Sequence, residues 1–137
     1  MSAVLTQPGP AARSLLAATV AAFAYGGWAY FVNASVSEQA GWRAAAIQGG
    51  YSFVLTTGMT LLMDYFLGVF RDTSQTVLKT TATISAICFA VAYGVHWAAN
   101  TPEILMTILP GFSIGFAYTL TYVIALNRQG RLENARS

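Results

Sequence analysis

Four long apolar runs, separated by nearly all of the charged residues, constrain this chain more than any other feature of its sequence. The hydrocarbon core of a bilayer is about 30 Å thick, which a helix crosses in roughly 20 residues. The runs that reach this length cover residues of about 14–32, 44–70, 80–99 and 104–126. Backbone groups in lipid must be paired within their own segment, so we predict helices and not strands. The sequence therefore predicts an all-α, integral membrane four-helix bundle, with residues 1–137 forming a single transmembrane domain.

The composition agrees with lipid as the main solvent of this chain. Only 9% of its residues are charged and 55% are hydrophobic, whereas a soluble domain carries about 25% charged residues. A single cysteine excludes an intramolecular disulfide and any metal centre built on several cysteines. Sequence motifs of the nucleotide-binding, zinc-peptidase, serine-hydrolase and dithiol types do not occur. We expect no metal, no cofactor, no enzymatic activity and no nucleic-acid partner.

The basic residues predict how the chain is oriented in the membrane. Cytoplasmic loops retain arginine and lysine. With the N-terminus inside, the basic residues on the cytoplasmic side are Arg13, Arg71, Lys79, Arg128, Arg131 and Arg136. Arg43 alone falls on the other side. We therefore predict a protein of the plasma membrane, which in a bacterium is the inner membrane, with both termini cytoplasmic.

An alternative for the first run is a signal peptide that is cleaved near Ala34. The run is longer than the apolar core of about 7–15 residues in a typical signal peptide. It also ends in Trp28, Tyr30 and Phe31, a grouping that is typical of aromatic anchors at a membrane interface. We therefore favour a retained first span.

The order of the spans suggests a duplicated hairpin. Residues 24–26 and 92–94 both read Ala-Tyr-Gly, and residues 50–52 (Gly-Tyr-Ser) resemble residues 111–113 (Gly-Phe-Ser). We interpret these matches as a parallel 2+2 repeat of two hairpins that both start inside. The predicted halves cover residues of about 14–70 and 80–126. The alternative is that spans rich in alanine and glycine match by chance.

Small residues predict where helices approach closely, because lipid tails do not drive helices together. The first span carries a small-residue ladder at Ala18, Ala22 and Gly26, and the fourth carries Gly111 and Gly115 as a GxxxG pair. These faces either pack within the chain or, for the fourth span, form a contact between two copies. We expect membrane lipid around the bundle and a homo-oligomer, with a dimer favoured.

Two prolines predict local features of the fourth span. Pro110 removes a backbone N–H and is expected to kink the helix about one turn from its outer end. Pro102 fits the first position of the helix, with Thr101 as the N-cap residue before it.

The second span carries most of the polar residues that we regard as candidates for a substrate or proton pathway. They are Gln48, Ser52, Thr56, Thr60 and Asp64, at four-residue steps. At about 100° per residue the row drifts about 40° per step, so it winds around the helix and cannot line one straight pore. Serine and threonine can also bond to carbonyls of their own helix, so the row suggests a pathway without requiring one.

Asp64 is the one acidic residue at membrane depth, where a charge is costly. We interpret it as a candidate proton or cation site, with Tyr118 and Tyr122 of the fourth span at a similar depth. The alternative is a hydrated carboxylate near the inner interface that pairs with Arg71 or Lys79.

His96 lies beside Trp97 near the outer end of the third span. It is either a structural residue of the aromatic belt or, since histidine changes charge near neutral pH, a pH sensor on the pathway. One histidine without companion ligands at metal-binding spacing predicts no metal site.

The length and the four-helix layout resemble those of small multidrug transporters. That family relies on a membrane-embedded glutamate in the first span, and residues 14–32 contain no acidic residue. Our leading hypothesis is a small transporter or lipid-handling protein for a hydrophobic or amphipathic molecule. The alternative hypothesis is a non-catalytic accessory or scaffold subunit that packs against a larger membrane-protein partner.

Overall fold

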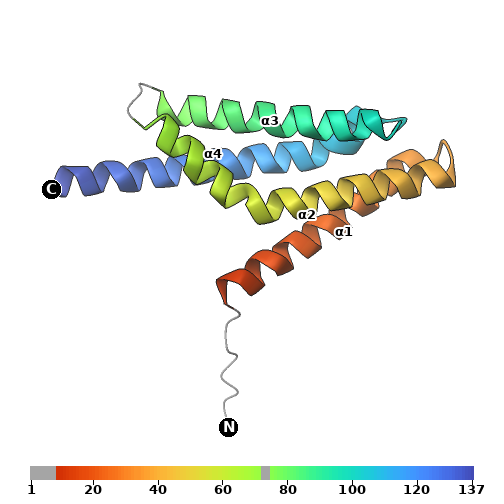
Figure 1. Cartoon of the computed structure of the whole chain (residues 1–137), viewed down its shortest axis with the longest axis horizontal. Helices are drawn as coiled ribbons and strands as arrows, with labels where there is room; N and C mark the ends of the chain where they lie inside the picture. The colour runs from red at the N-terminus through yellow and green to blue at the C-terminus, as the bar shows by residue number, and fades with distance from the viewer. Residues whose placement is uncertain (1–8, 72–74) are drawn as a thin grey trace, which may run out of the picture.

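Four helices make up the part of the chain that the computed structural model describes, residues 9–71 and 75–137. They are α1 (Pro10–Ala34), α2 (Glu38–Val69), α3 (Thr76–Ala98) and α4 (Ile104–Arg136). Each of the four is long and apolar enough to cross a membrane. The predicted all-α architecture with four helices of membrane-spanning length is confirmed, and successive helices alternate in direction (Figure 1).

The helices extend beyond the apolar runs that predict them. α2 begins at Glu38 and not at about residue 44, because the Ser37 hydroxyl accepts a hydrogen bond from the Ala40 N–H at 3.1 Å and caps the helix. α4 continues past residue 126 to Arg136. Hydropathy locates the part of a helix that lies in lipid, whereas caps and propensity decide where the helix begins and ends.

The expected N-cap at Thr101 is wrong. α4 begins at Ile104, with Glu103 at the N-cap position and no side-chain cap from that residue. The Thr101 hydroxyl instead lies 2.8 Å from Nδ1 of His96. Because the Thr101 hydroxyl is hydrogen-bonded to His96 of α3, it does not cap α4.

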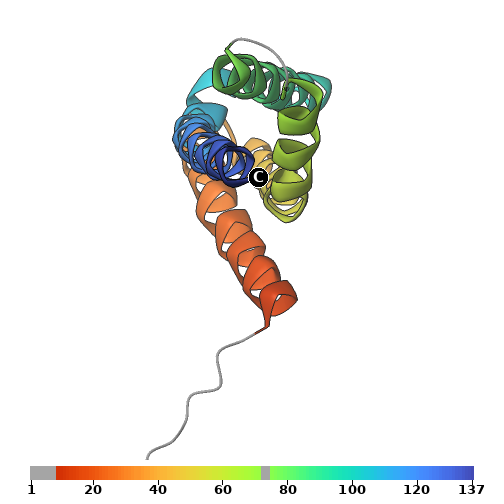
Figure 2. The same ribbon diagram turned by 90° about the vertical axis from the view of Figure 1, so that its left-hand side faces the viewer.

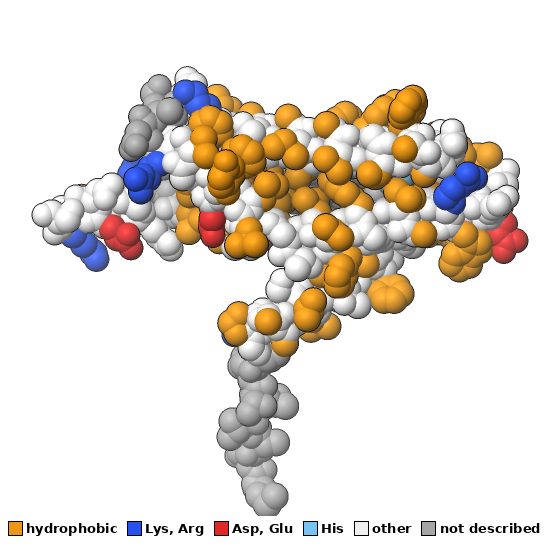
Figure 3. All heavy atoms as spheres, viewed as in Figure 1, with side chains coloured by type: hydrophobic (Ala, Val, Ile, Leu, Met, Phe, Trp, Pro, Cys, Tyr) orange, Lys and Arg blue, Asp and Glu red, His pale blue; other side chains and the backbone are white. Residues whose placement is uncertain are grey.

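The two ends of the molecule differ in charge. We call the end with the α1–α2 and α3–α4 connections the hairpin end, and the end with the α2–α3 connection and the C-terminus the basic end (Figure 1). Lys and Arg side chains gather near the basic end, Arg43 lies at the hairpin end, and hydrophobic side chains cover much of the length between them (Figure 3). This distribution is expected of a chain whose middle lies in lipid.

α1 and α2 approach each other through small residues. A Cβ atom added to Gly26 would lie 3.1 Å from the Ala45 carbonyl oxygen, and one added to Gly49 would lie 3.1 Å from the Ala22 carbonyl oxygen. Ala18 is fully buried two turns before Gly26. The small-residue ladder of the first span therefore packs within the chain, against α2. Beyond this contact α1 diverges from the other helices towards its N-terminal end (Figures 1 and 2).

α2 changes direction in its middle, as two views show (Figures 1 and 2). The Thr57 hydroxyl donates to the Phe53 carbonyl at 2.8 Å, one turn earlier, and Gly58 follows. Such back-bonding, next to a glycine, bends helices. The two parts of α2 consequently meet different neighbours: Gly49 contacts α1, whereas Met63 joins a core with α3 and α4.

Pro110 lies inside α4 and leaves the carbonyl of Met106, four residues earlier, without its usual helical donor. The indole Nε1–H of Trp28 in α1 donates to that carbonyl at 2.8 Å. A carbonyl freed in this way is costly in lipid unless another group pairs with it. Trp28, which we predicted as an interfacial anchor, therefore also ties α1 to α4.

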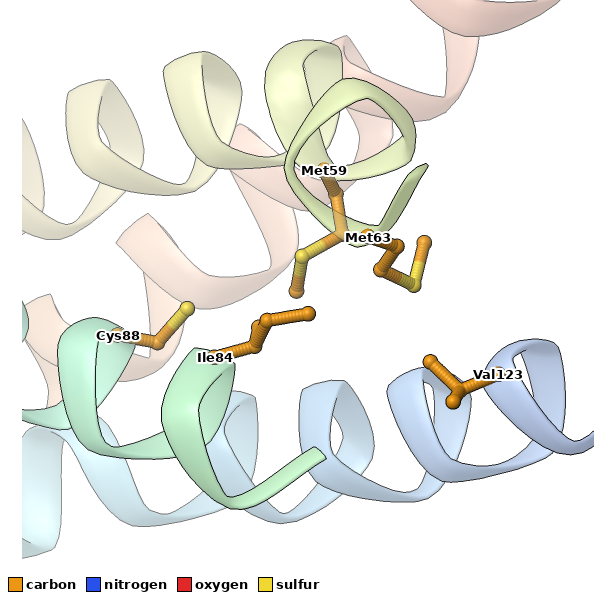
Figure 4. Packing of buried hydrophobic residues seen from close by; sticks show 5 residues of the cluster. All are labelled: Met59, Met63, Ile84, Cys88 and Val123. Atoms are coloured by element: carbon orange, nitrogen blue, oxygen red, sulfur yellow. The ribbon is translucent and has the colours of Figure 1, made fainter. Parts of the chain in front are cut away.

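A hydrophobic core joins α2, α3 and α4. Its buried members are Met59, Met63, Ile84, Cys88 and Val123. Their side chains point towards one another from the three helices (Figure 4). These contacts hold α2, α3 and α4 together, and no residue of α1 is among the described members of this core.

The hairpin repeat stays a prediction. Two residues that it matches make different contacts, since Tyr51 donates to the Cys88 carbonyl at 2.9 Å and Phe112 packs edge-on against Phe89. The two hairpins also pack differently: α1 meets α2 through glycines, whereas the Phe89–Phe112 pair lies between α3 and α4.

Candidate functional site

His96 forms a buried link between two helices at the hairpin end. Its imidazole is fully buried in the last turn of α3. Nε2 lies 2.8 Å from the Gln48 amide oxygen in α2, and Nδ1 lies 2.8 Å from the Thr101 hydroxyl. An amide oxygen only accepts, so Nε2–H donates to Gln48, and in the neutral ring Nδ1 accepts from Thr101. These bonds fix the orientation of both the imidazole and the Gln48 amide.

Gln48 turns the nitrogen side of its amide towards α4. Nε2 donates to the Ser52 hydroxyl at a long 3.4 Å, one turn along α2. A Cβ atom added to Gly111 of α4 would lie 3.5 Å from the same nitrogen. Gln48 and Ser52 are only 2% and 4% exposed, so both polar groups are held inside the bundle. We call Gln48, Ser52, His96 and Thr101 the His96 network.

A second buried cluster ties α1 to the beginning of α4. The Asn33 amide nitrogen donates to the Thr107 hydroxyl at 2.7 Å and to the Ala29 carbonyl at 2.9 Å. The Asn33 amide oxygen accepts from the Glu103 backbone N–H at 3.0 Å. Asn33 thus supplies, from another helix, an acceptor for the N-terminus of α4. Both N–H bonds of this amide are used and its oxygen accepts a third hydrogen bond, so the cluster holds the helices in place.

A cavity of about 320 Å³ lies next to the His96 network, and residues of all four helices line it. Gln48 and Ser52 form part of its wall, and Met59, Ile84 and Cys88 of the hydrophobic core form another part. The cavity therefore lies between a buried polar network and an apolar core, and it is partly open, since the exposed residues Ile114 and Tyr118 form part of its wall.

The wall of the cavity is mostly hydrocarbon. Among the residues that the structure describes, no charged side chain lines it. Apolar wall residues include Leu55, Ile108 and Phe116, and the polar ones include Thr56 and Ser85. An apolar concave site with few polar groups is typical of pockets for small molecules.

A groove between α1 and α4 adjoins the cavity. Ala17, Ala21, Tyr25 and Ile114 line both the groove and the cavity. The remaining wall of the groove is mostly apolar as well, with Leu16 among its residues. The groove and the cavity therefore share part of their wall, on the side of the molecule where α1 diverges.

Hydroxyl groups of α3 add unmet hydrogen-bonding capacity. Within residues 9–71 and 75–137, the hydroxyls of Thr80, Thr81 and Ser85 have no hydrogen-bond partner. Buried hydroxyls are usually paired. Ser85 also lines the cavity, so part of this capacity lies in the cavity wall.

The predicted pathway residues separate into two groups, and the first group meets at the cavity. Gln48, Ser52, Thr56 and Tyr118 line it. His96 is not one of the lining residues but reaches the cavity through Gln48. The structure thus brings together side chains from α2, α3 and α4 that sequence reasoning proposed separately.

The second group lies elsewhere. Thr60 and Asp64 are exposed on α2, and Tyr122 packs from α4 against the hydrophobic core. Asp64 is near enough to Tyr122 for an electrostatic interaction. The polar row of α2 winds from the inside of the bundle to its surface, in accord with a drift of about 40° per four residues.

Gly111 and Gly115, which we proposed as a packing pair, line the cavity. A Cβ atom added to Gly115 would meet no atom within 4 Å, and one added to Gly111 would lie at ordinary contact distance from Tyr25 and Gln48. Within one copy of the chain these glycines therefore keep space open. A dimer contact through them stays a prediction.

Sequence reasoning missed Asn33 and the α3 side of the cavity. Asn33 follows the first apolar run and is typical of a loop residue, and its burial depends on Thr107 and Glu103 from the other hairpin. Ser85 and Cys88 lie inside the third run without a polar pattern to mark them. A weak signal for Ser85 is its position one turn after Thr81, on the same helix face.

Comparisons with known proteins assign this chain to no family. No family model, no curated protein and no solved structure matches the chain. A functional proposal therefore rests on the fold and on the cavity.

Proposed function

We propose that this chain is a small multi-pass membrane protein that takes a hydrophobic or amphipathic molecule into the cavity between its helices, as a transporter or lipid-handling protein. The supporting observation is the cavity of about 320 Å³, whose mostly apolar wall carries a few placed polar groups. Binding sites of this composition occur between the helices of bundles. The proposed role is binding and movement of a molecule, and not catalysis.

The proposed route begins in the bilayer. A lipid-soluble molecule concentrates in the hydrocarbon region, so a lateral entrance serves it better than an aqueous one. The groove between α1 and α4 adjoins the cavity and shares Ala17, Ala21, Tyr25 and Ile114 with it. α1 diverges there and carries exposed apolar side chains such as Leu16 and Val20.

The proposed location is the plasma membrane, or the inner membrane of a bacterium, with both termini in the cytoplasm. The support is the unequal charge of the two ends. The basic end has five of the seven Lys and Arg residues, the hairpin end has Arg43, and Arg13 lies near the N-terminal end of α1. We include homo-oligomerisation in this proposal, with a dimer favoured.

The alternative is an accessory or scaffold subunit. It requires helix faces of small residues that are free to pack against a partner protein. In the described chain the face of Ala22 and Gly26 is already covered by α2. This observation favours a role that centres on the cavity.

Cys88 offers a test without an introduced label, because it is the single cysteine of the chain and lines the cavity. In proteoliposomes, N-ethylmaleimide alkylation of Cys88 is expected to slow about tenfold when decan-2-one is present at about nine times its Kd. Gly115→Phe places a benzyl group where a Cβ atom meets only open space, and it should remove the effect of decan-2-one. The measurement is the alkylation rate, read by mass spectrometry.

Gly94→Phe is the matched control. Gly94 also has no atom within 4 Å of an added Cβ, but it is exposed on α3 and does not line the cavity. This variant should be protected by decan-2-one like the unsubstituted chain. Protection that persists in Gly115→Phe, or no protection in the unsubstituted chain, would contradict the proposed function.

A further inference from the structure

We propose that the occupant of the cavity is an uncharged amphiphile with a carbonyl or similar acceptor oxygen, which Gln48 and Ser52 bind, and that its hydrocarbon part lies towards the hydrophobic core. This inference rests on the proposed function and names the ligand class of the same site. Long-chain ketones, acyl esters and quinones share this chemistry.

The residues that line the cavity indicate that its ligand is uncharged. No Asp, Glu, Lys, Arg or His side chain is among the described residues that line the cavity. An ion taken from water into such a site would have neither a counter-charge nor enough hydrogen bonds to replace its hydration. Arg13 lines only the groove, and His96 directs both ring nitrogens to protein partners. A neutral molecule avoids this cost.

The hydrogen-bonding character of the ligand follows from the His96 network. His96 Nε2–H donates to the Gln48 amide oxygen and so turns the opposite, N–H side of this amide towards Gly111 in the cavity wall. One N–H bond points to the Ser52 hydroxyl at 3.4 Å, and the amide has a second. Ser52 accepts from Gln48 and keeps its own hydrogen for donation. Two donors therefore meet at one side of the cavity, which fits an acceptor oxygen on the ligand.

The orientation of the ligand follows from the rest of the wall. Met59 and Ile84 line the cavity and belong to the buried core of α2, α3 and α4 (Figure 4). A hydrocarbon chain gains about 25 cal/mol for each Å² of apolar surface that it buries against aqueous surroundings, but far less when it comes from lipid. Affinity from the bilayer must therefore depend strongly on the polar end, so the head group should dominate selectivity.

The test compares four compounds of similar size at equal mole fraction in the bilayer, with Cys88 alkylation as the readout. Decan-2-one carries the acceptor oxygen, and 2-methyldecane replaces that oxygen with a methyl group. Decane-1-sulfonate and decyltrimethylammonium carry permanent charges. Decan-2-one should bind about tenfold more tightly than 2-methyldecane, and the two ions should give no protection.

Ser52→Ala keeps the His96–Gln48 bond and removes one donor, so it should reduce the preference for decan-2-one while protection by 2-methyldecane stays unchanged. Gly94→Phe serves again as the folded control. Equal protection by decan-2-one and 2-methyldecane, protection by either ion, or an unchanged preference in Ser52→Ala would overturn this inference while the cavity remained a binding site. If none of the four compounds protects Cys88, the proposed function itself fails.

Discussion

Gly49→Leu is expected to lower the free energy of unfolding by about 3 kcal/mol and to separate α1 from α2. A Cβ atom at this position would already lie 3.1 Å from the Ala22 carbonyl oxygen, which belongs to the backbone of α1 and cannot rotate away. The larger side chain therefore requires α1 itself to move. Helix association in lipid depends on close packing, so this shift also removes contacts along the rest of the seam. Equilibrium unfolding in mixed detergent micelles measures the change.

Gly50→Leu is the matched control for this substitution. Gly50 is the next residue of α2, is exposed, and has no atom within 4 Å of an added Cβ. Leucine has the higher helix propensity, so this variant should be as stable as the unsubstituted chain or slightly more stable. If Gly49→Leu and Gly50→Leu unfold at the same denaturant concentration, α1 does not pack on α2 as described.

His96→Leu is expected to lower the free energy of unfolding by about 2 kcal/mol. The substitution leaves the Gln48 amide oxygen and the Thr101 hydroxyl buried without their 2.8 Å partners. It should also release the Gln48 amide, so that the ligand preference weakens together with stability. Equilibrium unfolding measures the loss of stability, and the Cys88 alkylation assay measures the weaker ligand preference.

Thr101→Ser provides the control, because it keeps the hydroxyl that pairs with Nδ1 and should change neither stability nor ligand preference. A double substitution separates the contribution of the His96–Gln48 hydrogen bond to stability from the contribution of packing around His96. When His96→Leu is made in a Gln48→Met background, its cost should fall by about 1 kcal/mol, since one of the two stranded groups is gone. A cost that is the same in both backgrounds would mean that His96 stabilises the fold without bonding to Gln48.

The spans could be predicted from the sequence because lipid imposes a length and a polarity on each helix. The ends of the helices could not be predicted in the same way. Glu38 begins α2 because Ser37 caps it, and Thr101 does not cap α4 because His96 takes its hydroxyl. Local signals decide an end only where no tertiary partner competes for the same group.

The site could be predicted in part. Gln48 and Ser52 were candidates by their polarity, and both line the cavity. Asp64 had the strongest signal, a charge at membrane depth, yet it lies on the surface of the bundle. A helix that winds and bends presents its polar row to different neighbours, and a sequence does not say which neighbour covers which turn. Ser85 became visible only when the four helices were placed around it.

Native mass spectrometry gives the most direct test of binding inside the bundle. Protein released from bilayers that contain decan-2-one should carry a single bound molecule per chain, and Gly115→Phe from the same bilayers should carry none. Gly94→Phe should behave like the unsubstituted chain. A bound molecule that is equally abundant in Gly115→Phe, or absent from all three proteins, would contradict a ligand site in the cavity.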